Sequence, residues 1–245
     1  MAVSTPVEDR PPYTVVPMDR LRRVTAKRMR ASVEDKPHVT LHRYAAAEGL
    51  AARRTAERAA VGAEGAAISL TAVLVSVVAR ALAVNRRLNG RVEDGEIRLY
   101  EEVNIGVAVE VPGGLVVPVI RAADAIDVTT LASRLAQLAE TARSGRLRPE
   151  DMSDATFTIS NLGAYGIELF TPIISPPQLA ILGVGASATG VAVVDGELVP
   201  RTRLGLSLSF DHAAADGSDA ARVLADIVRA VEAPDDVLPP LGGGS

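Results

Sequence analysis

Cysteine and tryptophan are both absent from the 245 residues, and histidine occurs only three times. The lack of cysteine excludes disulfides, thiolate metal sites and a cysteine nucleophile, and it suits a reducing compartment, so we expect a cytoplasmic protein. No grouping of His, Asp and Glu has metal-ligand spacing, and the glycine-rich stretch "VPGGL" lacks the Lys-Ser or Lys-Thr of a phosphate loop. The sequence therefore predicts neither thiol chemistry nor a bound metal or nucleotide.

An excess of basic charge is also missing, because 26 Lys and Arg residues stand against 30 Asp and Glu residues. Nucleic acid and anionic membranes are therefore not expected as partners. The polar, proline-rich beginning of the chain has no basic start followed by an apolar run, so it does not resemble a secretory signal. The longest apolar run, "AAISLTAVLVSVVARALAV", is interrupted by Arg80 and falls short of the roughly 20 clean apolar residues that span a bilayer. It predicts a buried core helix.

Hydrophobic residues make up 48% of the chain and charged residues 23%, a balance typical of a soluble domain with a sizeable core. The spacing of apolar residues distinguishes helical from extended segments. Since neither an internal repeat nor a linker interrupts the pattern, we expect one α+β domain. Helices are predicted over 18–35, 48–60, 68–85, 127–144 and from 217 onward; strands within 38–47, 103–124 (two runs broken at Pro112, Gly113 and Gly114), 155–163 and 178–186; and a hairpin over 190–212 with an Asp195-Gly196 turn.

One of the three histidines lies inside the stretch "LSFDHAAADGSDAARVL", between a predicted strand and a predicted helix. His212 therefore lies in a tight connection, where an imidazole that titrates near neutrality can take a proton from a hydroxyl or thiol. Asp216 can fix the turn through an ion pair or by accepting backbone N–H bonds, and Gly217 lets the helix begin without a side chain that crowds the site. Spacing alone is equally compatible with a hydrogen-bonded core histidine beside a helix cap.

A hydroxyl is predicted at the end of another strand, where Ser160 precedes Asn161 and Gly163. Such a hydroxyl can donate to the oxyanion that develops in acyl transfer. The alternative is that Ser160 and Asn161 only satisfy backbone groups at the strand end. Among the other histidines, His38 can line a channel or serve in packing near a turn, whereas His42 belongs to no motif and is expected to be exposed.

Three of these stretches, 103–124, 156–185 and the His212 motif, together resemble the catalytic domain of the dihydrolipoamide acyltransferases of 2-oxo acid dehydrogenase complexes. The resemblance covers residues 18–234 and includes "RRVTAKRM", "KPHVTL" and "RRLNGRVEDGEI", which are long phrases. It predicts an N-terminal arm over 1–17, a catalytic domain over 18–234 and a C-terminal tail over 235–245. It also implies the two-layer fold of chloramphenicol acetyltransferase, with a mixed sheet, and a homotrimer or larger homo-oligomer whose active sites lie between subunits.

The resemblance assigns roles by motif position. His212 corresponds to the general base and Ser160 to the oxyanion donor, while Asp216 is a structural support that pairs with Arg22. Arg23 is a competing candidate for that pairing.

Two departures from the family pattern concern the acceptor side. Ala213, Ala214 and Ala215 stand where the family has an arginine and branched apolar residues, and Ser175 replaces the usual asparagine of "NPPQ". We therefore expect an altered acceptor pocket, while acetyl-CoA remains the expected co-substrate.

Complete members of the family carry a lipoyl domain and a small peripheral-subunit-binding domain upstream, whereas about 17 residues precede the matching region here. If the chain is a complete gene product, it carries no lipoyl group, and its acceptor arrives free or on another protein. Our first hypothesis is direct acetyl transfer from acetyl-CoA to a small-molecule hydroxyl, such as that of a tetronate intermediate in polyketide biosynthesis. The alternatives are the catalytic core of a 2-oxo acid dehydrogenase complex, which acylates dihydrolipoyl groups, and a non-catalytic trimeric scaffold.

Overall fold

The centre of the protein is a mixed β-sheet of six strands in the order β1-β10-β9-β8-β4-β7, as seen in a computed structural model that describes residues 13–62, 68–194 and 196–241. Strand β8 runs parallel to both β4 and β9, and the remaining neighbours are antiparallel. The predicted α+β class with a mixed sheet is confirmed. The strands are β1 (His38–Ala46), β4 (Ile105–Val107), β7 (Val119–Ile120), β8 (Phe157–Asn161), β9 (Ala180–Val194) and β10 (Glu197–Asp211).

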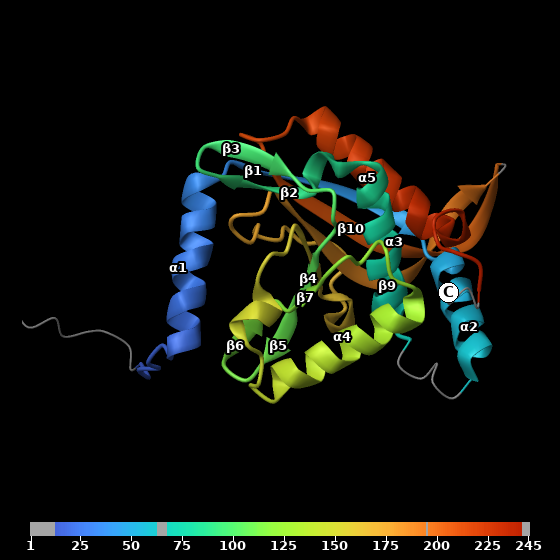
Figure 1. The fold of residues 1–245 in the computed structure, drawn as a ribbon. Coiled ribbons are helices and arrows are strands. Elements are labelled where there is room, and N and C mark those ends of the chain that lie inside the picture. The colour runs from blue at the N-terminus through green and yellow to red at the C-terminus, as the bar shows by residue number, and fades with distance from the viewer. Residues whose placement is uncertain (1–12, 63–67, 195, 242–245) are drawn as a thin grey trace, which may run out of the picture.

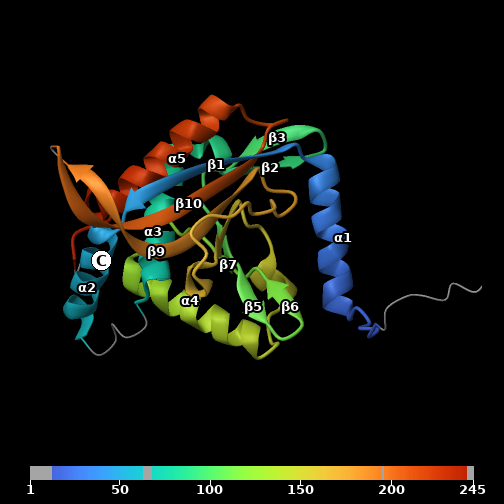
Figure 2. The ribbon, with the colours of Figure 1, turned by 180° about the vertical axis from the view of Figure 1, so that it is seen from behind.

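Helices cover one face of this sheet (Figures 1 and 2). Helix α3 (Leu70–Val84) is buried along nearly its whole length, as its apolar sequence predicts, and Ser69 caps its first turn by accepting from the Ala72 amide. Helix α5 (Gly217–Glu232) packs on α3 and β1, while α2 (Glu48–Val61) and α4 (Val128–Arg143) pack beside α3. In the inner half of β10, every second side chain points into this core, namely Leu204, Leu206, Leu208 and Phe210.

The opposite face of the sheet carries polar side chains, among them Thr40, His42, Thr158, Ser207 and Ser209, and is called the polar face below. Thr40 bonds to Ser209 at 2.7 Å, and His42 bonds to Ser207 at 2.9 Å, across the β1-β10 pair. Because side chains alternate along a strand, the residues between these positions fill the apolar core. The alternation of side chains along each strand thus places these polar groups on one side of the sheet.

An extended segment after β8 crosses the polar face and requires glycine beneath it. A Cβ added to Gly185 or Gly205 would lie 1.8 or 1.9 Å from the carbonyl oxygen of Glu168, a distance that no side chain tolerates. The segment is held further by the Phe170 amide, which donates to the Ser207 hydroxyl. Both glycines are therefore fixed by the close approach of this segment.

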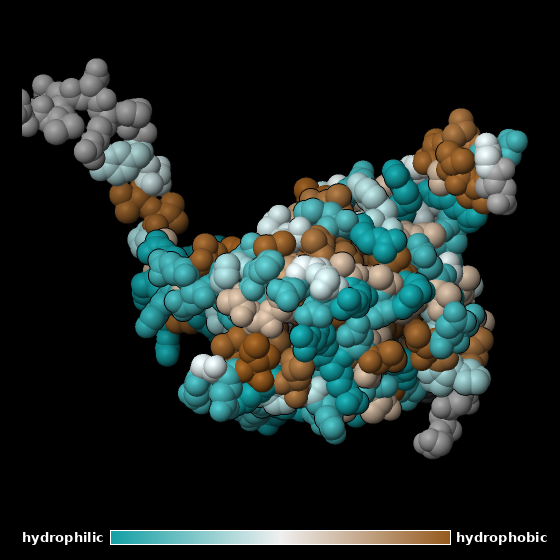
Figure 3. All heavy atoms as spheres, turned by 90° about the horizontal axis from the view of Figure 1, so that it is seen from above, coloured by the Kyte–Doolittle hydropathy of each residue, from teal (hydrophilic) through white to brown (hydrophobic). Residues whose placement is uncertain are grey.

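Two small hairpins flank the main sheet, one formed by β2 (Gly90–Glu93) and β3 (Glu96–Leu99), the other by β5 (Val109–Val111) and β6 (Gly114–Val116). The second hairpin confirms the turn predicted at 112–114, where Gly113 has a φ of 86°. The predicted strand at 178–186 and the first arm of the predicted hairpin form one strand, β9, whose outer part projects with β10 from the body (Figure 3). Of the predicted turn pair, Asp195 lies outside the described residues, and Gly196 has a φ of 86°.

Helix α1 (Arg20–Asp35) stands at the side of the body (Figures 1 and 2). Its N-cap, Asp19, accepts from the Arg22 amide at 2.7 Å, and contacts near its other end tie it to the loop before β9. Within the described ranges, none of the helices is long and apolar enough to cross a membrane. The remaining elements are 3₁₀ turns at Arg86–Leu88, Pro149–Met152, Gly163–Tyr165 and Pro234–Asp236, and the chain after the last of these buries Leu238.

Candidate active site

Ser160 lies near the end of β8 and points to the polar face, since Phe157 and Ile159 fill the core. Its side chain is partly exposed and lines a cavity of about 650 Å³, which Arg22 and Thr25 of α1 also line. Among the hydrogen bonds of the described residues, none involves the Ser160 hydroxyl. The hydroxyl is therefore free to donate into the cavity, and backbone satisfaction is not its role.

Asn161, the residue after Ser160, makes two side-chain hydrogen bonds. Its Oδ1 accepts from the Gly163 amide at 2.8 Å, and its Nδ2 donates to the Thr71 hydroxyl at 3.3 Å. These two bonds fix the chain directly after Ser160. Asn161 thus orients the strand end on which the serine lies.

The cavity also contains an acidic group, Glu110, which accepts a hydrogen bond from the hydroxyl of Tyr165. This bond, together with the negative charge of Glu110, raises the pKa of the Tyr165 phenol above its ordinary value. The phenol therefore stays protonated at neutral pH and does not serve as a base.

His212 is the first residue after β10, and its side chain is exposed in the single chain. Its amide donates to the Pro37 carbonyl at 2.9 Å, and its ring lies 5.5 Å from the ring of Phe210. In the part of the chain that is described, neither imidazole nitrogen has a hydrogen-bond partner. This geometry excludes the alternative of a satisfied core histidine and leaves both nitrogens available.

The supporting roles of Asp216, Arg22 and Gly217 are not accounted for by contacts within the described part of the single chain. Asp216 is the N-cap of α5, but its carboxylate caps no amide, and no ion pair joins it to Arg22 or Arg23 within the described residues. A Cβ at Gly217 would meet nothing within 4 Å, so steric crowding does not explain the glycine here. The ion pair between Arg22 and Asp216 is missing because the two residues lie at different places: Arg22 lines the Ser160 cavity, whereas Asp216 follows His212.

Ser160 and His212 do not meet within one chain. Ser160 is opposite Gly183 in β9, which is opposite Ser207 in β10, and His212 lies five positions beyond Ser207. With a rise of about 3.3 Å per residue and about 4.8 Å between strands, the two residues are roughly 15 to 20 Å apart. His212 also does not line the Ser160 cavity. One chain thus presents the two groups at different places on its surface.

The sequence analysis missed a buried ion pair beside His212. Lys36 Nζ lies 2.7 Å from Asp211 Oδ2, and both side chains are buried. The other carboxylate oxygen, Oδ1, accepts from the Ala213 amide at 3.1 Å. Alternation along β10 places Asp211 on the polar face with Ser207 and Ser209. This alternation was the only feature of the sequence analysis that could have indicated a buried carboxylate at Asp211.

His38 and His42 have different surroundings. The Ile174 amide donates to His38 Nε2 at 3.1 Å, so His38 Nδ1 donates to the Lys36 carbonyl at 2.8 Å. Both ring nitrogens are therefore committed to backbone groups, which favours packing over the channel-lining role. His42 is exposed, as expected, although it also bonds to Ser207.

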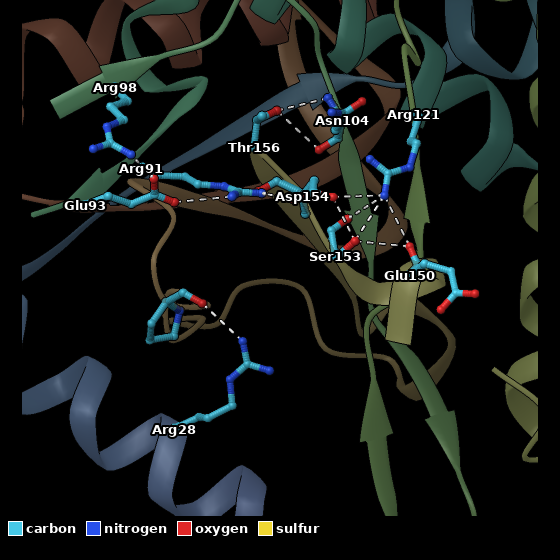
Figure 4. Close-up of polar contacts among 12 residues, drawn as sticks. Arg28, Arg91, Glu93, Arg98, Asn104, Arg121, Glu150, Ser153, Asp154 and Thr156 are labelled. Carbon is cyan, nitrogen blue, oxygen red and sulfur yellow. Dashed lines mark hydrogen bonds and ion pairs between the residues drawn. The ribbon is translucent and has the colours of Figure 1, made fainter. Parts of the chain in front are cut away.

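A second cavity of about 580 Å³ lies beneath α1 and shares Thr25 and Leu115 with the Ser160 cavity. Figure 4 shows its polar margin, where Arg28 donates to the Pro176 carbonyl and Arg121 reaches Asp154 at 3.0 Å. Hydrogen bonds from Ser153 and Arg121 lower the pKa of Asp154, so this carboxyl stays ionised. Over the described ranges, no group of three His, Asp or Glu side chains could hold a metal ion.

Comparison with known proteins agrees with this architecture. Residues 10–238 match the family model described as 2-oxoacid dehydrogenases acyltransferase (catalytic domain). The chain is 36% identical over 236 residues to the dihydrolipoyllysine-residue acetyltransferase component of the pyruvate dehydrogenase complex of Rickettsia bellii (strain RML369-C). That match covers 95% of this chain and 56% of the relative, so the chain spans about half the length of that protein.

Solved structures give the same result. The Azotobacter vinelandii dihydrolipoamide acetyltransferase, studied for a serine, a histidine and an asparagine in its catalytic mechanism, superposes with a TM-score of 0.89 at 35% identity. That match covers 97% of this chain and 99% of the other. The cubic core of a pyruvate dehydrogenase multienzyme complex has a TM-score of 0.89 at 34% identity, with the same coverage of both chains.

A chloramphenicol acetyltransferase shares only the fold, with a TM-score of 0.50 at 14% identity over 87% of this chain and 94% of the other, as the sequence analysis expected. The family match covers nearly the whole chain, and it includes Ser160, His212 and Asp216. The chain belongs to the 2-oxoacid dehydrogenase acyltransferase family and represents its catalytic domain.

Proposed function

We propose that this chain catalyses acyl exchange between coenzyme A and the thiol of a dihydrolipoyl group, as the catalytic core of a 2-oxo acid dehydrogenase complex. The relatives reported above are acetyltransferase components of such complexes, which supports this alternative over the tetronate hypothesis. None of those relatives is described as acting on a small-molecule hydroxyl. We further propose that the transferred acyl group is acetyl. The lipoyl group that accepts it is carried by another protein or by a segment outside this chain.

The observation that carries the proposal is the unpaired state of two groups with complementary chemistry. His212 takes the proton from the attacking thiol, and the sulfur then forms a bond to the thioester carbon of acetyl-CoA. The Ser160 hydroxyl donates to the oxyanion of the tetrahedral intermediate. When the carbonyl reforms, the C–S bond to coenzyme A breaks, and the proton held by His212 passes to the departing thiolate. The free, exposed imidazole and hydroxyl also argue against a scaffold without catalysis.

The spacing of these residues supports their assignment. In the Azotobacter vinelandii enzyme, the studied histidine follows the serine by 52 residues and precedes the asparagine by four. The same separations join Ser160, His212 and Asp216 in this chain. We infer that these three residues have the corresponding roles and that residues 18–234 form the catalytic domain.

The active site is proposed to lie between subunits, because one chain holds Ser160 and His212 roughly 15 to 20 Å apart by strand geometry. A ring of subunits related by a rotation axis can bring His212 of one subunit to Ser160 of the next. The same contact would bring Asp216 to Arg22, since Arg22 lines the Ser160 cavity and Asp216 follows His212. We propose a homotrimer as the smallest active unit; the similar pyruvate dehydrogenase structure is described as a cubic core, so a larger assembly is also compatible with this fold.

Asp216→Asn tests this contact. We expect weaker assembly and lower activity, with little change in the fold of a single chain, because the Asp216 carboxylate has no partner among the described residues. Analytical ultracentrifugation over a range of concentrations measures the assembly. Asp219→Asn is a matched control, because Asp219 also lies in the first turn of α5 but pairs with Arg87 of its own chain. Wild-type assembly and activity in Asp216→Asn would contradict the proposed pairing.

The acceptor is tested by supplying acetyl-CoA with dihydrolipoamide or with small alcohols and by measuring both coenzyme A release and the acetylated product. We expect transfer to dihydrolipoamide to exceed transfer to any alcohol by at least about 100-fold, because a thiol is much more acidic than an alcohol and needs less help from a base. Transfer to alcohols with no transfer to dihydrolipoamide would overturn the proposal. That result would instead favour the hydroxyl acceptor, for which the three alanines at 213–215 are the supporting observation.

A further inference from the structure

We propose that Lys36 is a positioning residue for His212 and acts through Asp211. The inference rests on the proposed function, because it takes His212 as the base of the acyl transfer. Lys36 does not contact the imidazole. Its ammonium group holds the Asp211 carboxylate, and that carboxylate fixes the first turn of the backbone that carries the imidazole.

The Asp211 carboxylate is divided between two tasks. Oδ2 accepts from Lys36 Nζ at 2.7 Å, and Oδ1 accepts from the Ala213 amide at 3.1 Å. The Asp211 carbonyl oxygen accepts in addition from the amides of Ala214 and Ala215 at 3.0 and 3.1 Å. One residue therefore holds three successive amides of the loop that begins with His212.

Lys36 comes from a different part of the chain and is itself well fixed. It is the C-cap of α1, and its amide donates to the Ser32 carbonyl at 3.1 Å. The next residue, Pro37, accepts from the His212 amide at 2.9 Å. Two consecutive residues of the α1–β1 connection thus hold both sides of His212, one through Asp211 and one directly.

The burial of this pair decides its importance. A solvent-exposed ion pair contributes little, because both charges remain hydrated without each other. Lys36 and Asp211 are only 8% and 3% exposed, so the loss of one charge leaves the other in a poorly hydrated place. The Asp211 carboxylate would then turn toward water, and the bond to the Ala213 amide would be lost.

The expected effect is a loss of turnover without a loss of thioester binding. Displacement of a supporting group by about 1 Å can cost roughly 100-fold in rate, and loss of a supporting contact typically costs about 10- to 100-fold. Lys36→Met should therefore lower kcat by about 10- to 100-fold. The KM for acetyl-CoA should stay within about threefold, because Lys36 lies away from the Ser160 cavity.

A matched control separates positioning from general stability. Arg53 and Glu57 form another buried ion pair at 2.7 Å, and Arg53 also holds the C-terminal segment through Asp235. Arg53→Met breaks a pair of similar burial that is remote from His212. Both variants should melt at lower temperature, but only Lys36→Met should lose kcat per folded protein.

Two further variants keep the inference testable if Lys36→Met folds poorly. Lys36→Arg retains the charge and should recover most of the wild-type kcat. The double variant Lys36→Met with Asp211→Asn removes both charges and keeps an acceptor for the Ala213 amide. It should regain much of the melting temperature, while its kcat should stay at least about fivefold below wild type, because the orienting ammonium is missing.

A measurement on the histidine ring distinguishes failure of this inference from failure of the proposed function. The chain has three histidines, so the ring ¹³C resonance of His212 is assigned by its loss in His212→Ala. We expect one sharp His212 signal in the wild-type protein and in Arg53→Met, and a shifted or broadened signal in Lys36→Met. The His42 signal should not change.

If the wild-type protein transfers no acetyl group to dihydrolipoamide, the proposed function fails, and the His212 ring signal still tests whether Lys36 positions His212. A wild-type kcat or an unchanged His212 signal in folded Lys36→Met, or a wild-type kcat in the double variant, would overturn the role of Lys36.

Discussion

His212→Ala is expected to lower the rate of acetyl transfer to dihydrolipoamide by about 10² to 10⁴, the range that a general base usually contributes. The loss should appear in kcat, because in the proposed mechanism the imidazole receives the acceptor's proton, and His212 does not line the cavity that contains Ser160. Steady-state kinetics with both substrates measures kcat, and calorimetric titration measures the affinity for acetyl-CoA, which should stay within about threefold of wild type.

The control for this prediction is His42→Ala. His42 is also exposed on the polar face and bonds only to Ser207 among the described residues, so its loss should leave kcat nearly unchanged. The melting temperature of His212→Ala should also remain near that of the wild type, since the His212 imidazole makes no hydrogen bond to any described residue. If His212→Ala lowers kcat by less than tenfold, His212 is not the general base of the reaction.

The sequence predicts the bounds of α1 and α3 well because the ends of these helices have local signals. The helix predicted over 18–35 is observed at Arg20–Asp35, and the one predicted over 68–85 at Leu70–Val84. In each case an N-cap side chain, Asp19 or Ser69, accepts from an amide in the first turn. The N-cap residue and the helical spacing of apolar residues lie within a few positions of each other. The start of such a helix can therefore be predicted without information from the rest of the chain.

The sequence analysis does not predict the β2–β3 hairpin. Each of its strands has only four residues, and β3 is exposed along its whole length. The residues of β3 do alternate between polar and apolar, and Asp94-Gly95 is a turn signal, but so short a run gives only weak evidence for a strand. Charged contacts between Arg98 and Glu93 stabilise the pair instead.

The candidate site was predicted in its chemical groups but not in its geometry. Motif position identified Ser160 and His212, yet spacing could not decide whether His212 was a satisfied core histidine. The structure decides this, because the imidazole lies beyond the end of β10 and is exposed. Lys36 and Asp211 are separated by 175 positions, so their contact depends on the pairing of β1 with β10 and has no local signal.

The proposed division of the site between chains also rests on strand register. Ser160 lies in β8 and His212 directly follows β10, with β9 between these two strands, and both side chains are accessible in the single chain. A second copy that packs against the first can supply the group that the first copy places too far away. The polar side chains in these strands, which are unusual for the interior of a single chain, suit such a contact.

Ser160→Ala is expected to lower kcat by about 10² to 10³, the usual contribution of one oxyanion donor. Its melting temperature should equal that of the wild type, because the hydroxyl has no partner in the described part of the chain. Ser209→Ala is the control, since it removes a buried hydroxyl that bonds to Thr40 and should lower stability without a loss of kcat. Mass spectrometry after incubation with acetyl-CoA alone should detect no acetyl group on Ser160, whereas a stable adduct there would indicate a covalent intermediate.

Mixing the two inactive variants tests the division of the site directly. In a cyclic assembly, a site is intact when one subunit contributes His212 and its neighbour contributes Ser160. Random assembly of equal amounts of His212→Ala and Ser160→Ala should therefore restore about one quarter of the wild-type activity. The variants are refolded together, and the activity is compared with that of each variant refolded alone. If both residues act within the same chain, no mixed assembly contains an intact site, and the mixture would show only the average of the two residual activities.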